Sequence, residues 1–380
     1  MIYLDNSATT YPKPMPVKNR MMQSLTSFGA NPGRSGYGMS IKTGEEVFAC
    51  RNEVSDFFHA DGPECVIFQP SCTQAINTVL KGCLKDGDHV VVSDLEHNAV
   101  MRPLKKLTKS GISYTVAATY PGDNDRTVAS FRKAITPLTK LVVCTQASNV
   151  FGIRLPVARI AALAHFYGAK ICVDCAQTAG VVPIDIQDEK IDYLCAAGHK
   201  GLYGPMGIGL LLLRSGDTLE TLIEGGTGTQ SRELNQPQEP PERYESGTQN
   251  ISGISGLRAG IRFVNSQGIE NIHAKEMRLI QYLYDRLKEI DGVLLYTEKP
   301  DFRHYVPVLS FNIKGVPSEV VGEYLAGRNI AVRCGFHCAP LAHDKMGTAD
   351  GTVRVSPSVF TNRNEMDILL QQIRYFVRRK

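Results

Sequence analysis

Between about residues 60 and 215, short apolar runs alternate with segments of helical pattern, and this alternation restricts the fold more than any other feature. Several runs are apolar throughout, which is typical of strands buried on both faces of a parallel sheet. Helical patterns cover about Thr73 to Lys85, Asn98 to Lys109 and Val157 to Tyr167. The alternation predicts an α/β domain with a mostly parallel sheet flanked by helices. The expected strands are CVIFQ, HVVVSD, KLVVCTQAS, AKICVDCAQ, DYLCAAG and IGLLLL.

The chain changes character after a polar, turn-rich stretch from Glu224 to Asn250, which we expect to be a surface loop or an inter-subunit segment. Two helical patterns follow, at about Ile254 to Ser266 and Ile269 to Ile290, and then short elements of mixed α+β type. We therefore expect a large domain over residues 1–257 and a smaller α+β C-terminal domain over residues 258–380. An N-terminal arm, about residues 1–15, should pack on the smaller domain.

Composition argues against several classes of function. The 42 Lys and Arg residues against 38 Asp and Glu residues give a net charge of +4, too small to indicate nucleic-acid binding as the main activity. The longest strongly apolar stretch, Gly207 to Leu213, is far too short to span a bilayer, and the N-terminus lacks the pattern of a signal peptide. The ten cysteines are scattered, so we expect reduced thiols in a cytoplasmic protein and no disulfide framework.

Polar residues follow the expected strands, at the sheet edge where open α/β folds bind ligands. Ser71 and Thr73 open a helix whose N-terminus could hold a phosphate, although taken alone such residues more often serve as an ordinary N-cap. The sequence thus predicts a ligand site at this edge. The other residues in such positions are His97, Asn149, Asp174, Gln177, His199 and Lys200.

Lys200 is the most informative of these residues. Most lysines point outward from a loop, but a lysine that ends a buried strand beside a glycine is badly placed for a solvated charge. Asp174 ends another apolar strand about 25 residues earlier. A Schiff-base lysine and a carboxylate opposite a pyridinium nitrogen are the two requirements of a pyridoxal phosphate site. In such a site, His97 could stack on the ring and Gln177 could hydrogen-bond the ring oxygen.

Motifs along the whole chain carry a specific resemblance. They are YLDNSATT, NPGRSGYG, LEHNA, SNVFGIRLP, VDCAQTAG, GHKGLYGPMGIG, ESGTQN, RCGFHCAP and VRVSPS. In these motifs the chain resembles the fold-type I pyridoxal phosphate (PLP)-dependent transferases of the class V aminotransferase group, specifically the cysteine desulfurase and selenocysteine lyase family. The combination of GHK, DCAQ and a late R-x-G-x-H-C is highly specific.

The resemblance implies roles for the residues around the cofactor ring. Lys200 would form the Schiff base with pyridoxal 5′-phosphate, and His199 would contact the phosphate. Asp174 and Gln177 would bind the ring nitrogen and the ring oxygen. His97 would stack on the cofactor and assist proton transfer.

The resemblance also implies contacts to the phosphate and the substrate. The phosphate turn would include Cys72 and Thr73. Thr227 would reach the phosphate from the partner subunit of a homodimer with shared active sites. Arg354 would pair with the substrate carboxylate, as a guanidinium does well, and Asn149 would lie near the substrate and the ring.

The RCGFHCAP stretch would carry the nucleophile of this family, and Cys338 is the matching residue. The chemistry requires one thiolate on a loop above the cofactor, where it can accept the substrate sulfur as a persulfide. We expect nearby Arg333 and His337 to lower the pKa of the Cys338 thiol.

Other interpretations of this stretch remain open. Cys334, His337, Cys338 and His343 could supply four zinc ligands, but their spacing is not one of the usual Cys-x2-Cys patterns, so we expect no metal. A Cys334–Cys338 disulfide would need a favourable loop geometry. Cys334 could also act as a second sulfur acceptor.

Three residues depart from the family pattern. Ala197 replaces a small hydroxyl residue two positions before the His-Lys pair, so one phosphate hydrogen bond would be missing or supplied by water. Cys72 replaces the first residue of a Thr-Thr pair. Gly201 looks like an additional residue that would shift the loop after Lys200. We expect such departures in a divergent branch of the family, and they do not remove the predicted cofactor contacts.

We therefore predict a homodimeric enzyme that converts L-cysteine to L-alanine and leaves the sulfur on Cys338 as a persulfide. A selenocysteine β-lyase on the same scaffold, a class V aminotransferase in which Cys338 is incidental, and a non-catalytic scaffold that binds a sulfur carrier remain alternatives. The substrate would be L-cysteine or L-selenocysteine. The short cysteine loop resembles the branch that depends on a sulfur-acceptor protein. No nucleic acid and no membrane are expected as partners.

Overall fold

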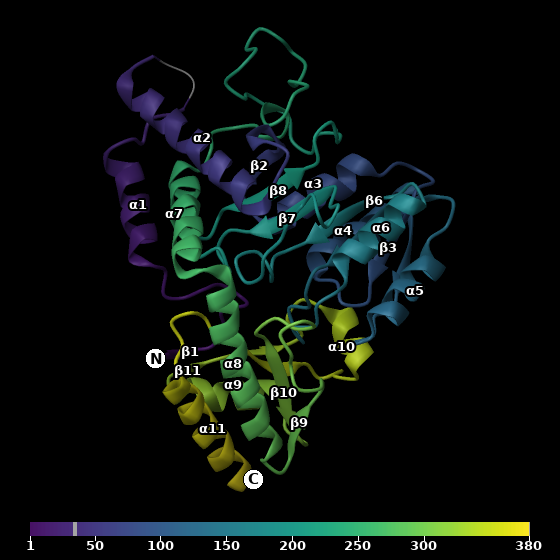
Figure 1. The fold of residues 1–380 in the computed structure, drawn as a ribbon, viewed down its shortest axis with the longest axis vertical. Helices are drawn as coiled ribbons and strands as arrows, with labels where there is room; N and C mark the ends of the chain where they lie inside the picture. Colours follow the sequence, from purple (N-terminus) through teal and green to yellow (C-terminus); the bar gives the residue numbers. More distant parts are fainter. Residues whose placement is uncertain (33–35, 380) are drawn as a thin grey trace.

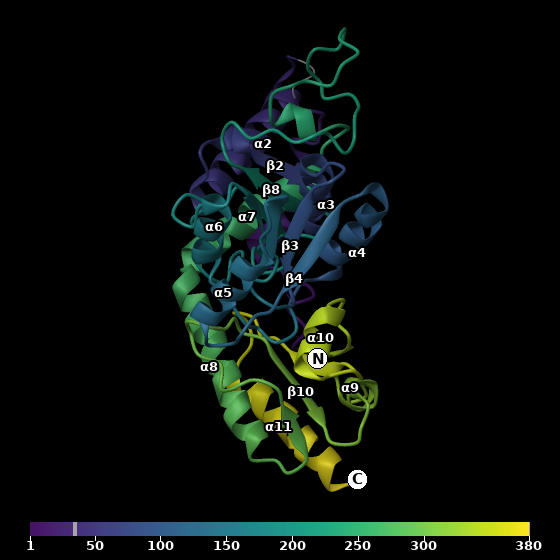
Figure 2. The same ribbon diagram turned by 90° about the vertical axis from the view of Figure 1, so that its right-hand side faces the viewer.

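The computed structural model describes residues 1–32 and 36–379, so residues 33–35 of the NPGRSGYG motif lie outside the described residues. Figures 1 and 2 show two lobes joined along one side by α8 (Ile269–Lys288). The larger lobe contains the long sheet and the smaller lobe contains a second sheet. Both chain termini lie at the smaller lobe (Figure 1).

The sheet of the larger lobe has, within the described residues, seven strands in the order β2-β8-β7-β6-β5-β3-β4. The strands from β7 to β4 run parallel, while β8 is antiparallel to both of its neighbours. The chain reverses at β8 because residues 198–208, which connect it to β7, form turns and loop instead of a crossover helix. The strands are β2 (Val66–Gln69), β3 (His89–Ser93), β4 (Ser113–Ala117), β5 (Thr139–Thr145), β6 (Lys170–Asp174), β7 (Tyr193–Ala197) and β8 (Gly209–Leu213).

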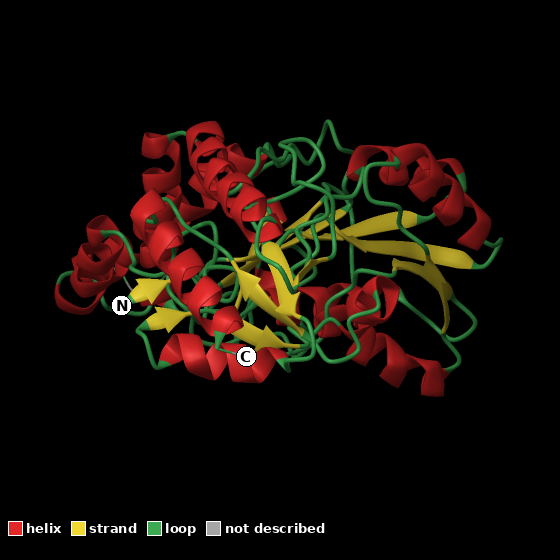
Figure 3. Ribbon diagram, turned by 90° about the horizontal axis from the view of Figure 1, so that it is seen from below, coloured by secondary structure: helices red, strands yellow, loops and turns green. Residues whose placement is uncertain are grey.

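Alternate residues of the central strands face two separate cores. In β6, Ile171 and Val173 belong to the core beneath α2, α5 and α6, whereas Cys172 belongs to the core beneath α3 and α4. Figure 3 shows helices on both sides of the sheet. This two-sided burial is why the strands read as continuous apolar runs. These helices are α2 (Gly38–Phe58), α3 (Cys72–Cys83), α4 (Asn98–Leu107), α5 (Asn124–Ala134) and α6 (Val157–Phe166).

The long helix α7 (Ile251–Gln267) packs against α1 (Met15–Thr26) and α2 in the larger lobe. It ends at Gly268, where α8 begins and continues into the smaller lobe. Residue 257, the expected end of the large domain, lies inside α7. Among the helices of residues 1–32 and 36–379, none is long and apolar enough to cross a membrane.

The smaller lobe is an antiparallel sheet in the order β12-β13-β10-β9, covered by α8, α9 (Ser318–Ala326) and α11 (Arg363–Arg378). Asn362 begins α11 with a capping box, because its side chain accepts from Glu365 N at 3.1 Å while the Glu365 side chain accepts from Asn362 N at 2.9 Å. The remaining elements of this lobe are β9 (Val293–Leu295), β10 (Leu309–Ile313), β11 (Ile330–Ala331), β12 (Arg333–Gly335), α10 (Pro340–Met346) and β13 (Thr352–Val355).

The N-terminal segment connects the two lobes. Its strand β1 (Ile2–Tyr3) pairs in parallel with β11, and Leu4 is buried in the core of the smaller lobe. Farther along, Thr10 N donates to the carbonyl of His199 at 3.1 Å, just after β7. The N-terminal segment therefore connects the smaller lobe to the end of β7, a central strand of the larger lobe.

The predicted α/β architecture with a smaller α+β part is confirmed. The strands β1, β4 and β9 and the helices α1, α2, α5 and α10 were not predicted. β4 lies at the sheet edge, and Ser113, Thr115 and Val116 are exposed there, so no continuous apolar run marks it.

Candidate active site

A pocket with about 840 Å³ of space, part of it open to solvent, lies where β5, β6 and β7 end. Residues Ser7 and Ala8 of the N-terminal segment line it, together with Arg333 and His337 of the smaller lobe. The structure thus brings most of the sequence-predicted site together. The predicted residues that line the pocket are Cys72, Thr73, His97, Asn149, Asp174, Gln177, His199, Lys200 and Arg354.

Lys200 follows β7 and shares this pocket with Asp174 at the end of β6. Its backbone carbonyl accepts from Thr10 Oγ1 at 3.0 Å and from Tyr203 N at 2.8 Å, which fixes the turn that carries the side chain. Burial lowers the pKa of Lys200 below its usual range, although the negative charge of Asp174 opposes that shift. A lysine with a lowered pKa has more of the neutral amine, which is the nucleophilic form.

The carboxylate of Asp174 is buried and oriented. Its Oδ1 accepts from Ala176 N at 2.9 Å and from the Cys72 thiol, whose Sγ lies 3.4 Å away. Gln177 Nε2 donates to Ser7 O at 3.1 Å, so the N-terminal segment also fixes that amide. A cationic ring nitrogen would find a carboxylate at this wall of the pocket.

The N-terminus of α3 forms the wall expected to hold a phosphate. Ser71 is an N-cap, since its Oγ accepts from Gln74 N at 3.1 Å, and Thr73 lines the pocket beside it. Strand β8 passes very close, because a Cβ on Gly209 would lie 2.4 Å from the carbonyl carbon of Ser71. Backbone N–H groups at such a helix N-terminus favour an anion. Ala197 lines the same pocket and brings no hydroxyl group.

His199 carries an unused polar atom in this pocket. Its Nδ1 is buried and has no hydrogen-bond partner among the described residues. Burial, with the nearby positive charges of Lys200 and Lys13, lowers the pKa of His199 to about 4, so the ring is neutral. Its carbonyl accepts from Lys13 Nζ at 2.7 Å, which fixes the backbone from the side of the N-terminal segment.

Gly201 packs tightly after Lys200. A Cβ on Gly201 would lie 2.5 Å from Ala179 O, and a Cβ on Gly180, whose φ is +79°, would lie 2.2 Å from Gly201 O. Gly201, the residue that looks additional in the sequence, therefore lies in close backbone contact with the turn after β6, and this contact requires glycine.

His97 is the N-cap of α4, a structural role that the sequence did not reveal. Its Nδ1 accepts from Ala99 N at 3.0 Å, so the neutral ring carries its proton on Nε2. Burial lowers the pKa of His97, although Asp174 opposes the shift. The capping bond thus fixes both the ring position and the tautomer in the pocket.

Arg354 is fully buried on β13 and points its guanidinium toward the same pocket. Its Nη1 donates to Asn149 O at 2.8 Å and its Nη2 donates to Asp5 Oδ1 at 2.7 Å. Its Nε is buried without a partner among the described residues. This nitrogen is a donor still available for a carboxylate.

The cysteine loop is attached to the site by its backbone. Asn98 N donates to Cys338 O at 2.7 Å, and Asn149 Nδ2 donates to His337 O at 2.7 Å. Cys338 itself does not line the pocket, but its neighbour His337 does, so Cys338, a partly exposed residue, lies at the pocket rim.

The charge expected from His337 is absent. Burial and the positive charge of Arg354 lower the pKa of His337 to about 2, so the ring is neutral at ordinary pH. Its Nε2 is 3.0 Å from Thr352 O and donates to that carbonyl. His337 therefore holds the loop and does not place a cation beside Cys338, whereas Arg333 does line the pocket.

The alternative interpretations of the loop find no support in its geometry. Cys334 and Cys338 are both free thiols, and the Cys334 side chain packs against Gly322 of α9. Across residues 1–32 and 36–379, no group of three or more His, Cys, Asp or Glu side chains could hold a metal ion.

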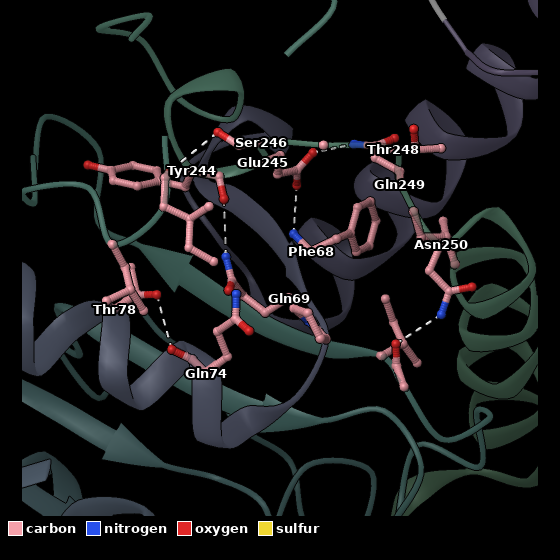
Figure 4. A pocket seen from close by; sticks show the side chains of 17 residues that line it. Phe68, Gln69, Gln74, Thr78, Tyr244, Glu245, Ser246, Thr248, Gln249 and Asn250 are labelled. Atoms are coloured by element: carbon pink, nitrogen blue, oxygen red, sulfur yellow. Dashed lines mark hydrogen bonds between the residues drawn. The ribbon is translucent and has the colours of Figure 1, made fainter. Parts of the chain in front are cut away.

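Thr227 does not line the pocket of its own chain. It lies in the segment from Glu224 to Asn250, where its hydroxyl is 3.2 Å from that of Thr229. The same segment closes a second pocket against β2 and α3, lined by Gln69, Gln74 and other residues (Figure 4). This second pocket holds none of the residues predicted to act on the cofactor ring.

Sequence reasoning missed several residues that line the site. Ser7 and Ala8 belong to the YLDNSATT motif, so the motif was noticed but no residue in it received a role. Asp5 forms an ion pair with Arg354. The parallel bridge between Asp5 and Ser356, two residues after Arg354, brings the two side chains together. The lining residues that received no role from the sequence are Ser7, Ala8, Ala99, Thr145 and Ala176.

Comparison with known proteins identifies the family. The family model described as aminotransferase class-V matches residues 2–369. The chain belongs to this family. Enzymes of the family use pyridoxal phosphate, and the buried lysine, the oriented carboxylate, the helix N-terminus and the unpartnered His199 Nδ1 fit that group.

Two curated relatives illustrate the similarity. A probable cysteine desulfurase of Methanothermobacter thermautotrophicus is 32% identical over 379 residues, which cover 97% of this chain and 92% of the relative. A probable cysteine desulfurase of Mycolicibacterium paratuberculosis is also 32% identical, but the chain spans only 55% of its length.

Two solved structures show the same fold over nearly the whole chain. The apo cysteine desulfurase of Thermococcus onnurineus superposes with a TM-score of 0.93 at 32% identity, covering 100% of this chain and 95% of that one. The cysteine desulfurase CsdA of Escherichia coli, in an S-sulfonic acid form, gives 0.88 at 27% identity, covering 99% and 94%. The fold-type I architecture predicted from sequence is therefore confirmed.

Proposed function

We propose that this protein is a PLP-dependent cysteine desulfurase that converts L-cysteine to L-alanine and transfers the sulfur to Cys338 as a persulfide. The observation that carries the proposal is one pocket that contains Lys200 and Asp174 and is bordered, at His337, by the loop that carries the partly exposed Cys338. In the net reaction the Cβ–S bond of the substrate breaks and a new S–S bond forms. Cysteine and a thiol thus become alanine and a persulfide, with no external oxidant.

The residues of the pocket would hold the cofactor from three sides. Lys200 would bind it covalently, Asp174 would pair with its ring nitrogen, and Thr73 with the α3 N-terminus and His199 would contact its phosphate. Bound there, pyridoxal phosphate supplies the electron sink that makes the Cβ–S bond labile.

Other residues would orient the substrate and move its protons. Arg354, with its Nε unpartnered, would bind the substrate carboxylate, and Asn149 would lie beside it. His97 presents a neutral ring whose proton is on Nε2, so this atom would donate a hydrogen bond in the pocket. To take a proton from the substrate, Nε2 would need the other tautomer, in which Nδ1 carries the proton and gives up the capping bond. Gln177 would face the ring oxygen. Cys338 would then accept the sulfur at the pocket rim.

The named relatives favour this activity over the alternatives. Those reported above are cysteine desulfurases, so a selenocysteine β-lyase is not favoured. An aminotransferase or a non-catalytic scaffold would not require a backbone-anchored cysteine at the pocket rim.

We further propose a homodimer. Thr227 lies outside its own active site, where a second copy of the chain could use it. It shares a pocket with Phe48 of α2, and both α1 and α2 expose apolar side chains. Met22, Leu25 and Phe48 have exposed fractions of 61%, 71% and 59%, which water disfavours and a partner subunit would cover. Sedimentation of the purified protein at twice the chain mass would support the dimer, and sedimentation as a monomer at working concentration would exclude it.

Partners and location follow from the same chemistry. A persulfide on Cys338 needs a thiol to remove it, so we propose a sulfur-acceptor protein that reaches the pocket rim. All ten cysteines are free thiols, which agrees with a reducing cytoplasm. We also propose that residues 1–257 and 258–380 form the two domains.

Sulfide and alanine release from L-cysteine with excess reductant tests the function. The wild type should turn yellow with cofactor and release both products in equal amounts, whereas Cys338→Ala should bind cofactor equally and release neither. A yellow wild type that is inactive on cysteine but releases selenide from selenocysteine would make it a lyase. A keto acid formed in place of alanine would make it an aminotransferase.

A further inference from the structure

Cys72, like Ala197, is a residue inside the pocket at which this chain departs from the family pattern. It is the first residue of α3, is 8% exposed and lines the site. Its Sγ lies 3.4 Å from Asp174 Oδ1 and donates its proton to that oxygen. The backbone N–H of Ala176 donates to the same oxygen at 2.9 Å.

Two donors on one oxygen fix the rotation of the Asp174 carboxylate. With Oδ1 held by Cys72 and Ala176, Oδ2 is the oxygen left to face a ring nitrogen in the pocket. Burial, reinforced by the negative charge of Asp174, raises the pKa of the Cys72 thiol well above its ordinary value. The thiol therefore keeps its proton and stays a donor, unlike the thiolate that a sulfur acceptor needs.

We propose that Cys72 is a positioning residue that orients Asp174 toward the ring nitrogen of the cofactor. The inference rests on the proposed function, because it assumes that pyridoxal phosphate occupies this pocket. A thiol is a weak donor, so it fixes the carboxylate while withdrawing little charge from it. Asp174 thereby remains a strong partner for a protonated ring nitrogen.

The competing interpretation is that Cys72 merely fills space in the core beneath α3, to which its neighbours Ala75 and Ile76 belong. The two interpretations differ in what they require of a substitution. Space filling requires volume, whereas positioning requires a hydrogen-bond donor. Serine keeps a donor at similar size, valine keeps the volume without a donor, and alanine keeps neither.

The first experiment measures the affinity of the cofactor-free protein for pyridoxal 5′-phosphate by its visible absorption. Cys72→Ala and Cys72→Val should both bind about fivefold more weakly, which corresponds to the loss of one hydrogen bond, while Cys72→Ser stays within about twofold of the wild type. Cys83→Ala, a thiol removed from the other end of the same helix, is the matched control and should bind normally. Wild-type affinity in Cys72→Val would overturn the proposal.

The second experiment repeats the titration with 1-deazapyridoxal 5′-phosphate, which has carbon in place of the ring nitrogen. If Cys72 acts through Asp174, its substitution should no longer weaken binding, because the analogue gives Asp174 nothing to pair with. An undiminished fivefold loss would show that Cys72 acts through the phosphate turn or the packing of α3, and would overturn the proposal. A wild type that binds neither compound would overturn the proposed function itself.

Discussion

Cys334 and Cys338 lie four residues apart in one motif, yet the fold gives them different environments. Cys338 lies at the pocket rim, is partly exposed and has a left-handed backbone with φ of +58°, next to His337 at +49°. Cys334 lies in β12 with its Sγ packed against α9, where a Cβ on Gly322 would meet it at 2.5 Å. Burial raises the pKa of Cys334 to about 12. A thiol with so high a pKa is a poor nucleophile.

We therefore predict that Cys334→Ala forms and transfers persulfide at the wild-type rate. Brief treatment of the native protein with iodoacetamide should label Cys338 and leave Cys334 unlabelled, as fragmentation of the peptide that contains both residues can show by mass spectrometry. Slower persulfide transfer in Cys334→Ala would instead support its role as a second sulfur acceptor.

At the residue scale, sequence reasoning works where a residue stands directly after a strand. Lys200, Asp174 and Asn149 could be predicted because parallel strands end at the same edge. Ser7, which lines the pocket, and Asp5, which binds Arg354, could not, since the pairing of β1 with β11 and the Asp5–Ser356 bridge place them there. The neutral state of His337 depends on burial by residues distant in sequence, so it too was unpredictable.

The start of α4 combines a structural and a chemical function in one side chain. Strand β3 ends at Ser93, and the chain turns through Glu96, whose carboxyl accepts from Thr145 N at 2.8 Å. His97 then caps α4 through Nδ1 and keeps Nε2 for the pocket. In the proposed mechanism, the capping bond and proton transfer would therefore require different tautomers of one ring.

Two substitutions separate these functions. His97→Ala should lower the free energy of unfolding by about 1 kcal/mol through loss of the cap, whereas His97→Asn, which can cap, should stay close to the wild type. Both should lower kcat at least about a hundredfold, because neither residue can transfer the proton. Urea unfolding and steady-state kinetics measure the two effects, and near-wild-type kcat in His97→Asn would contradict the proton-transfer role.

At the element scale, the prediction succeeds for helices and strands with a single clear signal. The buried strands β3, β5, β6 and β7 and the helix α11, with its capping box, were all predicted. β8 was predicted as a strand, but its antiparallel direction was not. That direction follows from the irregular connection of residues 198–208, which has no pattern that predicts it. α10 has only seven residues, fewer than a periodic pattern needs.

The two lobes meet around a buried carboxyl group. Glu276 of α8 is 4% exposed and accepts from the hydroxyl of Tyr203 at 3.4 Å. That hydroxyl accepts in turn from Val359 N at 3.1 Å. Through these two hydrogen bonds, Tyr203 in the turn after Lys200 is joined to the connecting helix α8 at Glu276 and to the smaller lobe at Val359. Burial raises the pKa of Glu276 to about 8, so the carboxyl is mostly protonated in the folded protein at neutral pH.

This group should make the folding stability depend on pH. Because folding raises the pKa of Glu276, protonation of this carboxyl stabilises the folded protein. This stabilisation is fully present below the ordinary pKa of 4.5 and is lost as pH rises to about 8. Glu276→Gln cannot ionise, so its stability relative to the wild type should increase between pH 5 and 8, by at most about 1.4 kcal/mol per pH unit. Urea unfolding of both cofactor-free proteins across this range is the measurement. Parallel stability curves would show that Glu276 is ionised in the folded protein.

At the scale of the whole molecule, the two lobes bring the loop that carries Cys338 to the pocket that contains Lys200, and the proposed persulfide on Cys338 is the central claim. Mass spectrometry of the holoenzyme after incubation with L-cysteine, without reductant, tests it most directly. The account predicts one additional sulfur atom on the peptide that contains Cys338 and an equal amount of alanine. Alanine formed with no sulfur on Cys338, or sulfur found on another cysteine, would contradict it.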